Sequence, residues 1–161
     1  MGRGRPIPRH TLRRISTDRA RWGAALPREL FCDTSFFYAC FDPGDLNHGR
    51  AQAIVAQAAS TGSVFAATWD IVSETVTLLR YRRNFQVALA FLDEVKPHLR
   101  IVAYGDRLRE EAEQIFRQYG RDHRLSFCDA ISFVVVTTLL DHVPCLAFDE
   151  DFRRLGLTVI G

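Results

Sequence analysis

The sequence has no long apolar stretch, and this lack limits the class of protein it can be. None of its apolar runs approaches the roughly 20 residues of a membrane-spanning helix, so we expect no membrane span. The amino terminus also has no apolar core of the kind that a secretory signal contains. We therefore expect a cytoplasmic protein.

Cysteine and histidine are few, and neither forms a recognisable cluster. The four cysteines make no C-x-x-C pair and lie among apolar neighbours, which predicts small buried side chains and not zinc ligands. The five histidines are scattered and do not pair with cysteine at zinc spacing. We also find no supported Ser/His/Asp triad. Any catalysis must therefore use other side chains.

The charge is unevenly distributed, although the net charge of the 161 residues is only +2. Residues 1–28 carry eight arginines and one acid, whereas residues 29–161 carry a net charge of −5. The first segment has Gly, Pro and Arg but no sustained apolar period. We predict a basic, flexible arm over 1–28 and one folded domain over 29–161.

Short apolar runs alternate with helical patterns through the rest of the chain. This alternation predicts an α/β fold, a single domain with a central parallel sheet flanked by helices in three layers. In helix 106–120 we expect Asp106 as the N-cap and Gly120 as the C-cap. The expected strands are 30–33, 63–68, 99–104, 145–148 and 157–160. The expected helices are 48–60, 70–83, 85–95, 106–120 and 126–142.

Acidic residues occur where these strands end or these helices begin. Asp33 ends the first strand run and Asp149 ends another, while Glu74 and Asp129 lie near helix starts. Ligands of parallel sheets bind beyond the carboxyl ends of the strands. Four carboxylates from distant parts of the chain could therefore share one pocket.

Each acid also has a purely structural interpretation. Asp129 fits a capping box with Ser126, and Asp33 could open a turn. Glu74 could be a solvated acid near a helix start. Asp149 and Asp151 could be turn and N-cap residues. These roles do not exclude a function, because a capping carboxylate still has an oxygen to offer.

Clustered carboxylates raise one another's pKa unless a cation lies among them. Hard oxygen ligands suit Mg²⁺ or Mn²⁺, which keep several waters and bind substrate phosphates. A metal would also explain how Asp129 can stay ionised within the apolar run "LSFCDAISFVVV".

The motifs "FCDTSFF", "SETVTLL", "LSFCDAISF" and "LAFDEDFRRLG" together resemble a PIN-domain ribonuclease, and most of all the VapC toxins of type II toxin–antitoxin systems. The resemblance covers roughly residues 29–161. It implies metal-dependent hydrolysis of RNA, with Mg²⁺ or Mn²⁺ as cofactor. The acids that it implies as metal ligands are Asp33, Glu74, Asp129, Asp149 and the less constant Asp151.

The resemblance also implies partners: an RNA substrate, an antitoxin protein and a second copy in a homodimer. The apolar segments 36–41 and 85–92 could form these protein surfaces or belong to the core. Family members often carry Thr or Ser where this chain has Ala147, so a supporting hydrogen bond is in doubt. RNA contacts are expected from Thr34, Arg80, Arg82, Arg83, Arg121 and Arg124.

Two alternatives stay open at this point. One is a PIN-fold nuclease of housekeeping RNA processing, and the other is a catalytically silent binding module. A phosphatase of the haloacid-dehalogenase type is disfavoured, because its D-x-D follows the first strand and here the D-E-D lies near the end.

Overall fold

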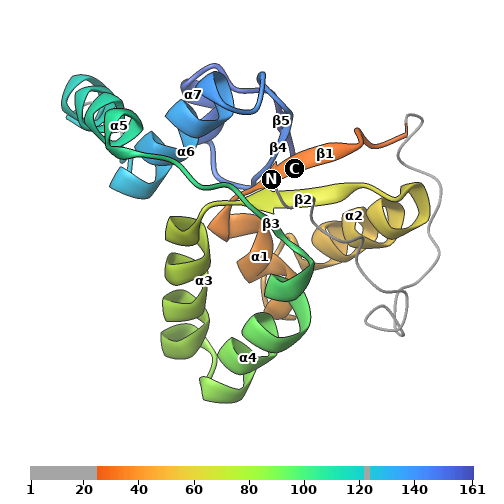
Figure 1. Cartoon of the computed structure of the whole chain (residues 1–161). Coiled ribbons are helices and arrows are strands. Elements are labelled where there is room, and N and C mark those ends of the chain that lie inside the picture. Colours follow the sequence, from red (N-terminus) through yellow and green to blue (C-terminus); the bar gives the residue numbers. More distant parts are fainter. Residues whose placement is uncertain (1–24, 122–123) are drawn as a thin grey trace.

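The computed structural model describes residues 25–121 and 124–161. Their centre is a five-stranded parallel sheet in the order β3-β2-β1-β4-β5. Figure 1 shows α1 to α4 on one side of the sheet and α5 to α7 on the other. The predicted three-layer α/β fold is confirmed. The strands are β1 (Glu29–Cys32), β2 (Val64–Ala67), β3 (Arg100–Ile101), β4 (Cys145–Leu146) and β5 (Val159–Ile160).

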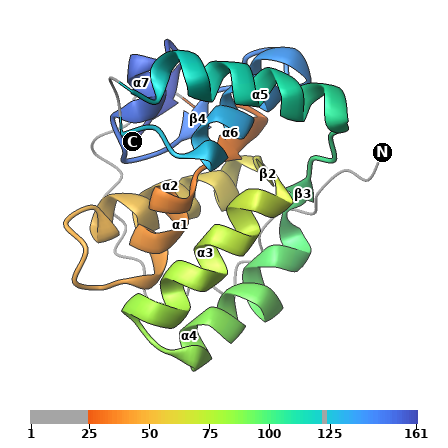
Figure 2. The same ribbon diagram turned by 90° about the vertical axis from the view of Figure 1, so that its left-hand side faces the viewer.

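Seven α-helices connect and cover these strands within the described residues. In Figure 2, α3 and α4 run side by side below the sheet, and α5 lies over α6 at the opposite side. The helices are α1 (Thr34–Phe41), α2 (His48–Thr61), α3 (Trp69–Arg82), α4 (Phe85–Ala90), α5 (Asp106–Tyr119), α6 (Phe127–Thr138) and α7 (Asp151–Arg154). A π-helical turn, Phe91–Val95, and a 3₁₀ turn, Lys96–His98, follow α4.

The core between the layers is rich in phenylalanine. Phe36 of α1 meets Phe65 of β2 edge-on at 5.6 Å and stacks with Phe148 at 6.2 Å between ring centroids. Phe37 meets Phe91 edge-on at 5.1 Å. Apolar burial of this kind is the main driving force for folding. It also fixes α1, the helix that begins at the first acid, against the sheet.

Several predicted elements differ from the structure. The strand predicted over 99–104 comprises only Arg100–Ile101, which pair with Ala66 and Ala67 of β2. The helix predicted over 85–95 continues as a π turn after Ala90, and the helix predicted over 126–142 ends at Thr138.

The N-cap of α5 is Gly105 and not Asp106, which is the first helical residue, whereas Gly120 is the C-cap as predicted. Helix α1 was not predicted. Four of its eight residues are buried and none is exposed, so they show no polar face that would mark a helix.

All four cysteines are free; Cys32 and Cys145 are buried as predicted, and Cys40 and Cys128 are partly buried. The apolar segments 36–41 and 85–92 contribute mainly to the core, through Phe36, Phe37, Ala39, Ala88 and Phe91. No helix in the described part of the chain is long and apolar enough to cross a membrane.

Most of the predicted basic arm, residues 1–28, lies outside the described residues. Its last part joins the domain, because Leu26 packs against the core and the Arg28 carbonyl accepts a 2.8 Å hydrogen bond from Val64. The boundary at residue 28 stays a prediction.

Candidate metal and RNA site

Asp33 lies at the carboxyl end of β1, the central strand of the sheet, and caps helix α1. Its Oδ2 accepts hydrogen bonds from the Ser35 backbone N–H at 3.0 Å and from the Ser35 hydroxyl at 2.5 Å. The side chain is almost fully buried. Burial, with a smaller contribution from the nearby Asp129, raises the pKa of Asp33 to about 6, against the lowering effect of the Ser35 bonds.

Asp129 occupies the first turn of α6 and forms a complete capping box. Its backbone N–H donates to Ser126 Oγ at 3.0 Å, and its Oδ2 accepts from the Ser126 backbone N–H at 2.8 Å. Burial raises the pKa of this carboxyl, and the charges of Glu74 and Asp149 raise it as well. The structural interpretation of Asp129 is therefore confirmed, and the same side chain also faces two other acids.

Glu74 belongs to the second turn of α3, near the start of the helix as predicted. Its Oε2 accepts a 2.8 Å hydrogen bond from Thr34 Oγ1, at the start of α1. Glu74 and Asp129 both contribute to the raised pKa of the Cys128 thiol, after burial. Glu74 is thus brought close to the first and third acids by tertiary packing.

Asp149 and Asp151 lie after β4, in the loop and at the start of α7. Asp149 is exposed and its Oδ1 accepts from the Asp151 backbone N–H at 2.9 Å. Asp151 is buried and pairs with Arg154 at 3.2 Å. The N-cap of α7 is Glu150, so Asp151 is the first residue of the helix and not its cap.

The acidic centre, defined as Asp33, Glu74, Asp129 and Asp149, contains no basic partner. None of these four carboxylates forms an ion pair with a Lys, Arg or His among the residues that the structure describes. Asp151 differs, because Arg154 already neutralises it. The four acids repel one another in a partly dehydrated place, and a cation would relieve that repulsion.

The donor set of the acidic centre fits Mg²⁺ or Mn²⁺ in chemistry. Carboxylate oxygens are the ligands that these hard ions prefer, and Mg²⁺ needs only one or two of them because waters and phosphates complete its shell. Over residues 25–121 and 124–161, no three His, Cys, Asp or Glu side chains are grouped to hold an ion as they stand. Hydrogen bonds to Ser35, Thr34 and Ser126 each hold one of the acids in place.

Ala147 is fully buried after β4 and has no hydroxyl to support the next residues. The bond comes from elsewhere: the Phe148 backbone N–H donates to Ser35 Oγ at 3.0 Å. Sequence reasoning missed this long-range bond of Ser35, although Ser35 stands two positions after the first acid in "DTS".

The predicted RNA-contacting arginines have different environments. Arg80 packs over the Phe85 ring at 5.6 Å, and Arg82 and Arg124 are exposed. Arg83 forms a 2.8 Å ion pair with Asp42, so its charge is already partnered. Arg121 is exposed too.

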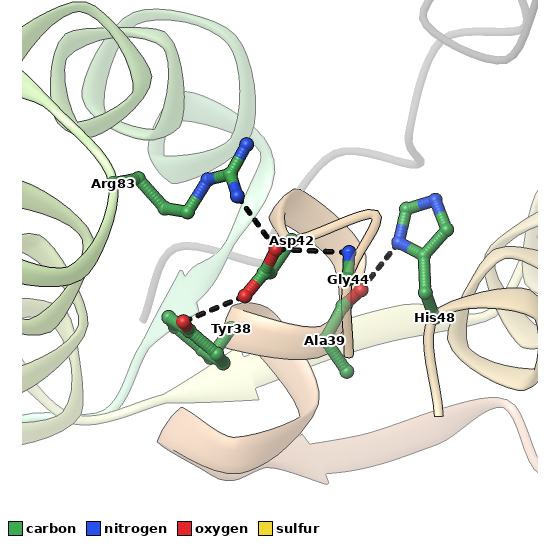
Figure 3. A network of polar contacts seen from close by, with 6 residues as sticks. All are labelled: Tyr38, Ala39, Asp42, Gly44, His48 and Arg83. Carbon is green, nitrogen blue, oxygen red and sulfur yellow. Dashed lines mark hydrogen bonds and ion pairs between the residues drawn. The ribbon is translucent and has the colours of Figure 1, made fainter. Parts of the chain in front are cut away.

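The Asp42 junction is a polar network that closes the far end of the seam between α1 and α3. Asp42 accepts from the Tyr38 hydroxyl at 2.7 Å, from the Gly44 N–H at 3.0 Å and from Arg83 at 2.8 Å. Figure 3 shows these bonds beside the 2.7 Å bond from His48 Nδ1 to the Ala39 carbonyl.

The seam is therefore fixed at two points. The bond from Thr34 to Glu74 joins the start of α1 to α3, and the bond from Arg83 to Asp42 joins the ends of the two helices. Sequence reasoning missed Asp42, because only the fold brings it to Arg83, 41 positions away.

The family of the chain follows from comparison with known proteins. The PIN domain matches residues 30–157, which include all five predicted acids. The chain belongs to the PIN-domain family. The 23S rRNA-specific endonuclease VapC20 of Mycobacterium tuberculosis is 32% identical to it over 133 residues, which cover 81% of this chain and 97% of the relative. A VapC ribonuclease of Archaeoglobus fulgidus is 30% identical over 133 residues, with 80% of each chain covered.

Solved structures agree with this assignment. The crystal structure of Mycobacterium tuberculosis VapC20, described as a sarcin-ricin loop cleaving toxin, matches this PIN domain with a TM-score of 0.68 and 29% identity. The match covers 80% of this chain and 96% of that one. VapBC2 from Rickettsia felis, bound to a DNA fragment from its promoter, has a TM-score of 0.59 and 9% identity over 82% of this chain and 97% of that one, a likeness of fold alone. The predicted resemblance to VapC proteins is confirmed.

Proposed function

We propose that this PIN domain is a divalent-metal-dependent endoribonuclease and the toxin of a type II toxin–antitoxin system. The observation that carries the proposal is the acidic centre, in which four carboxylates from separate elements interact electrostatically without a basic partner. The relatives named VapC20 and VapC ribonuclease support the same chemistry.

Asp33, Glu74, Asp129 and Asp149 would hold Mg²⁺ or Mn²⁺, with Asp151 as a weaker candidate because Arg154 competes for it. The metal, when bound, lowers the pKa of a water and stabilises charge on phosphate oxygens. The chain itself must keep the acids ionised, orient their oxygens and hold the RNA phosphate in line. The expected products are a 5′-phosphate and a 3′-hydroxyl.

The RNA would run along the edge of α3 that leads away from Glu74. Tyr81 is 83% exposed and lies seven positions after Glu74. Seven residues span two helical turns, so the two side chains share one edge of the helix about 10 Å apart. Arg80 and Arg82 flank Tyr81 and could bind phosphates while the ring stacks on a base. Arg124 and Arg121 precede α6 and could add further contacts.

VapC20, at 32% identity, suggests the first RNA to test, the sarcin-ricin loop of 23S rRNA. A toxin of this kind also requires an antitoxin that covers the acidic centre, and we expect a homodimer. Growth arrest on expression of the wild type, relieved by the antitoxin, would favour the toxin over a housekeeping nuclease.

The deciding experiment compares the wild type with Asp129→Asn on RNA containing the sarcin-ricin loop, in Mg²⁺, Mn²⁺ or EDTA. Asparagine keeps the size and the helix cap but loses the charge that a metal needs. We expect the wild type to cleave the RNA in Mg²⁺ or Mn²⁺ but not in EDTA. The folded variant should not cleave it under any of these conditions.

Glu110→Gln is the matched control, since it removes one exposed acid from α5, away from the acidic centre. This variant should cut like the wild type. Equal cleavage by Asp129→Asn would contradict the proposed site, and a wild type that cuts no RNA with either metal would favour a silent binding module.

A further inference from the structure

Ser35 connects the first acidic segment of the PIN domain to the last. Its hydroxyl donates to Asp33 Oδ2 at 2.5 Å and accepts from the Phe148 backbone N–H at 3.0 Å. Phe148 directly precedes Asp149, and it lies 113 positions from Ser35. One hydroxyl therefore spans the two ends of the acidic centre.

The direction of both hydrogen bonds is fixed by chemistry. A backbone N–H can only donate, so the Ser35 oxygen must accept from Phe148. The single hydroxyl proton is then free to go to Asp33, which as a carboxylate can only accept. Since the Ser35 backbone N–H also binds Oδ2, the same oxygen of Asp33 is held twice and the carboxylate is oriented.

The second bond holds the turn that carries Asp149. Ala147, two positions before Asp149, offers no side-chain hydroxyl. The turn that carries Asp149 is instead attached to the start of α1, through Ser35 and through the stacking of Phe148 on Phe36 at 6.2 Å. The Asp33 backbone N–H adds a 2.9 Å bond to the Leu146 carbonyl of β4.

We propose that Ser35 is the positioning residue that sets Asp33 and Asp149 relative to each other, and thereby prepares the acidic centre to bind a divalent cation. The inference rests on the proposed metal-dependent function. Ser35 does not touch the RNA or the reacting atoms in this role. It acts through Asp33 on one side and through the backbone before Asp149 on the other.

The test measures Mn²⁺ binding directly, by calorimetry and by electron paramagnetic resonance, on wild type, Ser35→Ala and Ser35→Thr. Partners that orient metal ligands typically contribute 10–100-fold to metal affinity, so we expect Ser35→Ala to weaken Mn²⁺ binding by about tenfold or more. Ser35→Thr keeps the hydroxyl and should restore most of the affinity. Thermal unfolding without metal checks that each variant is folded.

Ser63→Ala is the matched control. Ser63 is also a buried hydroxyl in a hydrogen bond, with Thr61 Oγ1 at 2.8 Å, but it precedes β2, at the amino end of the strand and not at the carboxyl end. This variant should bind Mn²⁺ like the wild type. A general loss of stability would affect both serines, whereas a positioning role affects Ser35 alone.

The outcomes separate this inference from the proposed function. If folded Ser35→Ala binds Mn²⁺ as tightly as the wild type, Ser35 is only part of a helix cap and the inference is wrong. If Ser35→Ala loses affinity but the wild type cuts no RNA, the inference stands and the nuclease proposal fails. A wild type that binds no Mn²⁺ overturns both.

Discussion

The hydroxyl of Thr34 donates a 2.8 Å hydrogen bond to Glu74 Oε2 and so joins two acidic segments that are 40 positions apart. Thr34 is the residue after Asp33, and Glu74 lies on α3. The bond therefore orients Glu74 toward the end of β1. That Thr34 also contacts RNA stays a prediction.

Replacing Thr34 by valine should leave Glu74 without this donor and lower RNA cleavage by about 10–100-fold, as for other groups that orient metal ligands. Thr34→Ser keeps the hydroxyl and should retain activity. Cleavage rates at saturating metal measure the effect. Unchanged rates in a folded Thr34→Val would mean that Glu74 needs no such support.

Asp33→Asn should stabilise the metal-free protein at pH 7 while it abolishes cleavage. The pKa of Asp33 is about 6 in the folded protein and 3.8 as its usual value. A raised carboxyl pKa means that ionisation opposes folding, by on the order of 2–3 kcal/mol above pH 6. Asparagine keeps the cap without the charge.

The size of this effect depends on pH. Between about pH 4 and pH 6 the folded wild type holds a proton that the unfolded chain has lost, so its stability falls as the pH rises. The advantage of Asp33→Asn in urea unfolding with EDTA should grow over this interval and level off above it. A constant difference from pH 4 to pH 7 would contradict the raised pKa.

Mn²⁺ should raise the melting temperature of the wild type and not that of Asp33→Asn, because an ion that binds only the folded state stabilises it. The shift should shrink below pH 6, where Asp33 takes up a proton. Thermal unfolding at several Mn²⁺ concentrations measures it. Equal increases in the melting temperature of both proteins would mean that Mn²⁺ binds at a site that does not include Asp33.

Loss of Asp42 should destabilise the PIN domain more than loss of Arg83. Asp42→Ala removes the acceptor for three hydrogen bonds, whereas Arg83→Ala removes one. The hydrogen bond from the Tyr38 hydroxyl lowers the pKa of Asp42. The stability that ionised Asp42 contributes should therefore be present at neutral pH and be lost in acid, as the pH falls through this lowered pKa. Melting temperatures of the two variants test the order.

Arg80→Ala combined with Arg82→Ala should weaken RNA binding and make it less dependent on salt. For single strands, each lost phosphate contact lowers the slope of log K against log salt by about 0.7, so two contacts account for about 1.4. A short single-stranded RNA and the Asp129→Asn background allow binding to be measured without cleavage.

Arg107→Ala with Arg117→Ala is the control for this measurement, because both arginines are exposed on α5 and pair with glutamates there. An equal loss in both double variants would show that only the net charge matters.

The sequence by itself determined the layer architecture and the identity of the acids. Alternating apolar runs and helical patterns predict a parallel sheet. The acids at strand ends and helix starts predict that these side chains lie together beyond the carboxyl ends of the strands. The capping box of Ser126 and Asp129 could be read directly, because both partners lie within one helical turn. Helix α1 could not, because none of its residues is exposed and it lacks the polar face that marks a helix.

Only the tertiary structure decided how the acids are held and which charges are free. The bonds of Ser35 to Phe148 and of Thr34 to Glu74 join residues that are distant in the chain, so no local pattern announces them. In the sequence "RYRRN" nothing distinguishes Arg83 from Arg80 and Arg82, yet in the structure Arg83 forms an ion pair with Asp42. Local chemistry shows in the order of residues, whereas long-range hydrogen bonds and the pKa values that burial sets exist only after the chain has packed.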